Sequence, residues 1–186
     1  AASARAARKA TSTIPIVMVS AGNPIQAGLV ASLARPGGNV TGLTNLTSEL
    51  HGKRVELLKE AVPKVTRIAF LDDDDRVEQS PFKYAQEAAQ VLAVKLDRVE
   101  LKSANPDFDG AFRLMVKERV GAVITSAGFL STTQKKKKIL ELLEQARLPA
   151  MHGSISWIDD GGLMYYGVNS SDLYRRAATY VDKILK

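Results

Sequence analysis

Polar side chains recur just after the apolar runs of this sequence, in loops where they could hold a small ligand. In an open parallel sheet, ligands bind outside the carboxyl ends of the strands, where such loops meet. Hydroxyl and amide groups there can hydrogen-bond a carboxylate or an amine, and the helix N-termini that follow favour an anion. The alternative is that some of these residues only cap helices or form turns. The candidate ligand-binding residues are Ser20, Asn23, Asn45, Asp73, Asp74, Ser126, Gly128 and Ser154.

Four ring-bearing side chains near these loops have two interpretations each. His152 follows an apolar run, so it either contacts a ligand or is a structural histidine bonded inside the protein. Trp157 and the pair Tyr165 and Tyr166 either stack on an aromatic ligand or pack in the core or at a hinge. The sequence leaves these alternatives open.

The acidic run from Asp72 to Asp75 suggests a different chemistry. Paired carboxylates after a strand are typical of receiver domains, which bind magnesium and accept a phosphoryl group. That class also needs an aspartate and a lysine at the ends of later strands, where this chain has Ser126 and His152. A calcium loop would need alternating ligands and a central glycine. We therefore favour a solvated acidic turn before the next helix and keep a receiver-like signalling domain as an alternative.

Catalytic motifs are absent from the sequence. It has no cysteine, and its two histidines, His51 and His152, lie far apart in the chain. No Gly-x-Ser-x-Gly surrounds Ser126 or Ser154, and neither a P-loop nor a Gly-x-Gly-x-x-Gly is present. We expect a protein that is not an enzyme and that uses no cofactor and no metal.

The net charge of +6 is concentrated in Arg5, Arg8 and Lys9 and in the run from Lys135 to Lys138. No aromatic residues are interleaved with the lysines, so we expect solvated surfaces and no nucleic-acid partner. No apolar run approaches the roughly 20 residues that span a bilayer. Residues 1–13 lack the apolar stretch of a signal peptide, so we expect none within this chain.

Short apolar runs alternate with helical patterns, which predicts an α/β fold with a doubly wound parallel sheet covered by helices on both sides. A seam between two parts is expected near residues 44–47. Strands are expected at 14–19, 39–43, 67–71, 95–101, 121–125, 149–151 and 163–166. Helices are expected from Asn23-Pro24, over 47–62, and from Ser80, Asn105, Ser131 and Ser170 or Ser171.

Several stretches resemble the ABC-transporter substrate-binding protein family, relatives of aromatic amino-acid binding proteins. The most specific is the run Leu-Ala-Arg-Pro-Gly-Gly-Asn-Val-Thr-Gly at 33–42, and the likeness covers essentially the whole chain. The other stretches are 11–17, 28–32, 52–59, 161–164 and 180–185. The resemblance implies a fold like that of type I periplasmic binding proteins, with two lobes around a cleft. It also implies a periplasmic protein that binds a small molecule, such as an amino acid or small organic acid, and delivers it to an ABC permease.

The resemblance further implies that this chain is shortened at both ends. We expect a remnant of the first lobe at 1–45 and 167–186, and a second α/β lobe at 46–166. Asn23 replaces the usual aspartate, and Asp73-Asp74 the frequent Asn-Pro, so either the ligand differs or binding is lost. Exposed sheet edges also favour a homodimer. The alternative function is therefore a non-binding remnant that self-associates.

Overall fold

The computed structural model describes residues 2–19, 23–45, 48–73, 80–102, 104–126 and 133–186. The chain divides into two compact units. The small unit combines Ala1–Thr47 with Val168–Lys186, and the large unit is Ser48–Gly167. Within the described residues, no helix combines the length and the apolar character that crossing a membrane requires.

The large unit is built on a five-stranded sheet in which every neighbouring pair of strands is parallel. The strands follow the order β4-β3-β5-β6-β7. The sheet grows from β3 first towards β4 and then, on the other side, through β5, which makes the β3–β5 junction its topological switch point. The predicted doubly wound α/β class is confirmed. The strands are β3 (Arg67–Asp73), β4 (Lys95–Leu101), β5 (Ala122–Thr125), β6 (Ala150–His152) and β7 (Met164–Tyr165).

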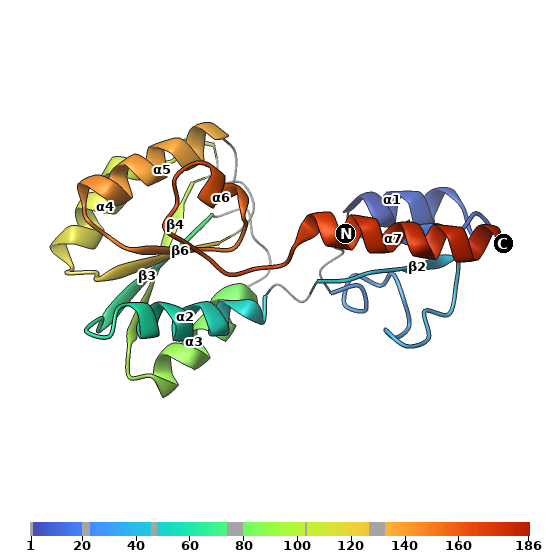
Figure 1. Cartoon of the computed structure of the whole chain (residues 1–186), viewed down its shortest axis with the longest axis horizontal. Coiled ribbons are helices and arrows are strands. Elements are labelled where there is room, and N and C mark those ends of the chain that lie inside the picture. Colours follow the sequence, from blue (N-terminus) through green and yellow to red (C-terminus); the bar gives the residue numbers. More distant parts are fainter. Residues whose placement is uncertain (1, 20–22, 46–47, 74–79, 103, 127–132) are drawn as a thin grey trace. The chain divides into compact units, whose positions relative to one another are not determined.

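Helices cover both faces of this sheet. Figure 1 shows α2 and α3 against one face and α4 and α5 against the other. A short helix, α6, follows β6. The helices are α2 (Leu50–Ala61), α3 (Ser80–Val91), α4 (Phe108–Lys117), α5 (Thr133–Gln145) and α6 (Ser156–Asp159).

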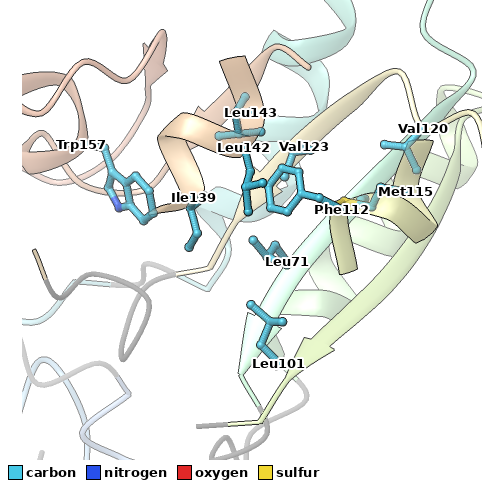
Figure 2. Close-up of a cluster of buried hydrophobic side chains, with 12 residues drawn as sticks. Leu71, Leu101, Phe112, Met115, Val120, Val123, Ile139, Leu142, Leu143 and Trp157 are labelled. Atoms are coloured by element: carbon cyan, nitrogen blue, oxygen red, sulfur yellow. The ribbon is translucent and has the colours of Figure 1, made fainter. Parts of the chain in front are cut away.

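Two buried cores flank the sheet because successive side chains of a strand point to opposite faces. On β3, Ile68 and Phe70 pack with the α2 and α3 side chains, whereas Ala69 and Leu71 pack with those of α4 and α5. Figure 2 shows the second core, with Phe112 of α4 among the leucine side chains of α5. Burial of each large apolar side chain stabilises the unit by about 2 kcal/mol.

Three helices end in the same way and so direct the chain into the next strand. Ala93, Arg119 and Arg147 follow α3, α4 and α5 with φ between 51° and 56°. The next amide donates to the carbonyl five residues earlier, as in a Schellman motif. These bonds join Val94 to Ala89, Val120 to Met115 and Leu148 to Leu143, each at 2.9 Å. The helix expected from Asn105 begins later, because Asp107 caps it by accepting from the Gly110 amide at 2.8 Å.

The small unit pairs β1 with β2 in parallel, beside α1 and α7. Gly42 has a φ of 136°, and a Cβ there would lie 2.0 Å from the Met18 carbonyl oxygen, so only glycine fits. The helix expected from Asn23 is wrong: residues 24–28 form turns, and Gly28 ends them with a φ of 67°. The elements are α1 (Ala2–Ala10), β1 (Ile16–Met18), β2 (Val40–Gly42) and α7 (Ser170–Leu185).

Candidate ligand-binding site

The carboxyl edge of the large unit's sheet carries a set of buried polar side chains. Because its strands are all parallel, their carboxyl ends meet at one edge, and the switch point between β3 and β5 lies there. Asp72 lies near the end of β3, Thr125 and Ser126 at the end of β5, and His152 at the end of β6. All four are nearly inaccessible to solvent.

Asp72 is paired with an arginine from the neighbouring strand. Its Oδ2 lies 3.0 Å from a terminal nitrogen of Arg98, although only 1% of the Asp72 side chain is exposed. Arg98 also binds Glu100 at 2.9 Å and lies over the Phe82 ring. The expected solvated acidic turn is therefore wrong for Asp72, because β3 continues through it. In the part of the chain that the structure describes, no three histidine, aspartate or glutamate side chains could hold a metal ion.

Two of the predicted site residues lie at this edge. The Ser126 amide donates to the Leu71 carbonyl at 2.9 Å, which holds Ser126 beside the end of β3. Ser154 follows β6, is half-buried, and its Oγ lies 3.1 Å from the Ser156 Oγ.

The remaining predicted residues lie in the small unit or outside the described residues. Asn23 and Asn45 belong to the small unit, where Asn23 is exposed and accepts from the Gln26 amide at 3.0 Å, as a turn residue does. Ser20, Asp74 and Gly128 lie outside the described residues, as does the side chain of Asp73.

His152 is bound inside the protein on two sides. Its Nδ1 lies 2.9 Å from the Thr125 hydroxyl, and its ring stacks on Trp157 with centroids 4.4 Å apart. Burial lowers the pKa of His152 to about 4, so the ring is neutral at pH 7. These contacts are those of a structural histidine. Trp157 is likewise a core residue, only 1% exposed.

A buried arginine beneath the same edge was not predicted from the sequence. Arg54 of α2 is 1% exposed and donates from Nε to the Tyr166 carbonyl at 2.8 Å. A second guanidinium nitrogen lies 2.9 Å from the His51 Nε2. Because arginine only donates hydrogen bonds, His51 accepts at Nε2 and, when neutral, carries its proton on Nδ1. Burial lowers the pKa of Arg54 to about 10.

Arg54 also approaches the loop after β6. A Cβ at Gly153 would lie 3.0 Å from one guanidinium nitrogen of Arg54, so glycine permits the close approach. A sequence signal for the burial of Arg54 does exist. His51, Arg54, Val55 and Leu58 follow the helical spacing of one face, and all four are buried.

The lysine run of α5 is not wholly solvated, contrary to expectation. Lys136 is 6% exposed and donates to the Ser156 carbonyl at 3.0 Å. It also forms an ion pair with Asp160. These contacts join α5 to α6 and hold the segment that follows His152.

A family profile described as "ABC transporter substrate binding protein" matches residues 1–186. This chain belongs to that family. The predicted membership is confirmed, and proteins of this family bind substrates for ABC transporters and are generally not enzymes.

Relatives of this ABC transporter substrate-binding protein are known by sequence and by structure. A "Tyrosine-binding protein" of Clostridioides difficile is 43% identical over 75 residues, which are 40% of this chain and 21% of the relative. A conserved domain protein from Vibrio cholerae is 26% identical, with a TM-score of 0.79 over 98% of this chain. An ABC domain in complex with L-Trp from Streptococcus pneumonia is 20% identical, with a TM-score of 0.76 over the same share. The chain spans 60% of the length of each of these two structures.

Proposed function

We propose that this protein binds an amino acid or small organic acid in an interlobe cleft and delivers it to an ABC permease in the periplasm. In this proposal, residues 46–166 form one lobe, and residues 1–45 with 167–186 belong to the other. The observation that carries it is the carboxyl edge of the large unit, where Ser126 lies at the switch point beside the Asp72–Arg98 pair. The proposed ligand contacts are Ser20, Asn23, Asn45, Asp73, Asp74, Ser126, Gly128 and Ser154.

The chemistry of this edge suits a ligand with both an amine and a carboxylate. Asp72 and Arg98 place a carboxylate and a guanidinium side by side, and Ser126 and Ser154 add hydroxyl groups that can donate or accept. The relatives support the same class of ligand, since one is named as a tyrosine-binding protein and another is a complex with L-Trp. Amino acids are therefore the first ligands to test.

The test is a thermal-shift panel of amino acids and small organic acids, followed by calorimetry for any ligand that stabilises the protein. A ligand at 100 times its dissociation constant should add about 2.7 kcal/mol of stability. Ser126→Ala should then weaken binding about tenfold, since it removes one hydrogen bond. Ser170→Ala, at an exposed position in α7, is the matched control and should bind as the wild type does. A panel without any stabilising ligand contradicts the proposal.

Self-association without a ligand is the second candidate function, and exposed apolar side chains of the small unit favour it. Ile14 is 65% exposed, Leu33 53%, and Leu185 80%. A homodimer that covered these side chains would remove them from water. Light scattering at micromolar concentration decides this candidate, because a mass of one chain contradicts a stable dimer.

A further inference from the structure

The buried guanidinium of Arg54 has only neutral partners among the described residues. These are the carbonyl of Tyr166 and the imidazole of His51. The other buried or half-buried arginines of the large unit are different: Arg67 pairs with Asp97 and Glu118, and Arg98 pairs with Asp72 and Glu100. Within the described ranges, Arg54 takes part in none of the ion pairs.

A buried cation without a counter-charge is strongly unfavourable. Arginine cannot relieve the penalty at neutral pH by losing its proton. Burial is the largest influence on the pKa of Arg54 and lowers it, and no carboxylate among the described residues acts to raise it. No described residue supplies the negative charge that would balance Arg54. A bound anion could supply it.

The loop after β6 is the place where an anion would lie close to the charge of Arg54. Gly153 follows β6 at the carboxyl edge of the sheet, and its missing side chain lets the guanidinium of Arg54 lie against this loop. Ser154, the next residue, is half-buried and has a hydroxyl group that can donate to an acceptor. The positive charge of Arg54 thus lies directly beneath the loop that reaches the ligand-binding edge.

We propose that Arg54 is a specificity-determining residue whose charge, acting through the Gly153–Ser154 loop, selects ligands that carry a carboxylate. The inference rests on the proposed function, because it assigns the ligand's carboxylate to this corner of the site. Arg54 acts by its electric field across the loop, and Gly153 and Ser154 provide the direct contacts. Ligands that lack the carboxylate bind weakly, because they gain nothing from the positive charge of Arg54.

The experiment compares acetate with acetamide, which have nearly the same shape but differ by one negative charge. Each is titrated into the full chain at constant ionic strength, and the amide NMR signals of Gly153 and Ser154 are followed. In the wild type, acetate should shift these signals saturably, and acetamide should leave them in place. In Arg54→Met the acetate response should weaken at least tenfold, and Arg54→Lys should retain part of it because the charge remains.

Two further variants keep the test independent of folding. Arg67→Met removes an arginine that pairs with Asp97 and Glu118, and it should retain the full acetate response. If Arg54→Met does not fold, Gly153→Ala replaces it, because the added methyl group displaces the guanidinium from the loop. The inference is overturned if acetate does not shift the wild-type signals, or if acetamide shifts them equally. An undiminished acetate response in Arg54→Met or Gly153→Ala overturns it as well.

The amino-acid panel separates this inference from the proposed function. If no amino acid and no organic acid larger than acetate stabilises the protein, but the acetate response depends on Arg54, the proposed function fails and the anion site stands. If an amino acid binds wild type and Arg54→Met with equal affinity, the selectivity role fails and the proposed function stands.

Discussion

The imidazole of His152 lies flat on the indole of Trp157, with ring centroids 4.4 Å apart and only 6° between the ring planes. The Thr125 hydroxyl bonds the same imidazole at Nδ1. Both contacts bury a ring that is most stable here without a charge. This small assembly fixes the end of β6, from which the Gly153–Ser154 loop departs.

The first prediction concerns acid stability. The pKa of His152 is about 4 in the folded protein and about 6.5 when unfolded, so the unfolded chain takes up the proton first as the pH falls. The contribution of His152 to the free energy of unfolding is therefore complete above pH 6.5. It declines as the pH falls towards 4, by up to about 3 kcal/mol. Urea unfolding at pH 7 and pH 4.5 measures this loss. His152→Phe should remove this part of the dependence, and an unchanged dependence in the variant contradicts the assignment.

The second prediction concerns the ion pair between Asp72 and Arg98. Arg98→Met removes the cation beside a carboxylate that is 1% exposed, which should cost about 3 kcal/mol of stability. Glu100→Gln is the matched control, because Glu100 is half exposed and binds the same arginine. It should change the free energy of unfolding by less than about 1 kcal/mol. If both variants lose the same free energy of unfolding, the buried pair stabilises the protein no more than the exposed one, which contradicts the prediction.

The third prediction concerns the parallel pair of strands in the small unit. Gly42→Ala places a methyl group against the Met18 carbonyl and also forces a φ of 136° on alanine. We expect a loss of about 3 kcal/mol or more, seen as faster hydrogen exchange in β1 and β2. Gly38→Ala is the control, since a Cβ at Gly38 meets nothing within 4 Å. Slow exchange in the Gly42 variant, like that of the control, contradicts the described pairing.

The fourth prediction concerns the start of α7. The Asn169 side chain accepts a hydrogen bond from the Asp172 amide at 3.1 Å, so Asn169→Ala should cost about 1 kcal/mol. Ser171→Ala should cost much less, although the sequence alone favoured Ser170 or Ser171 as the cap. Thermal unfolding of the two variants identifies the residue that caps this helix.

Hydrophobic periodicity predicted most of the elements in the large unit. The strand at Lys95–Leu101, for example, was placed at its observed bounds. The Asn23-Pro24 helix failed, because a good cap and a proline cannot outweigh a glycine at a positive φ five residues later. Local signals of this kind carry no information about tertiary packing, which decides whether a segment becomes a helix.

The polar groups of the candidate site were only partly predictable. Serines after strands are visible in the sequence, and Ser126 and Ser154 do lie at one edge of the sheet. Arg54 was missed because charged residues are normally assigned to the solvated face of a helix. Its burial depends on Tyr166, more than a hundred positions later, and no local pattern encodes that contact.

The two units differ in how their residues are distributed along the chain. The large unit is one continuous segment, 48–167, whereas the small unit needs both 1–47 and 168–186. During synthesis the ribosome releases the large unit whole, and it can fold while α7 is still being made. Residues 1–47 must meanwhile wait for α7 to emerge, with Val17 and Leu43 lacking their partners Leu173 and Ala177. Residues 1–47 are thus synthesised before the large unit but complete their packing only after α7 has followed it.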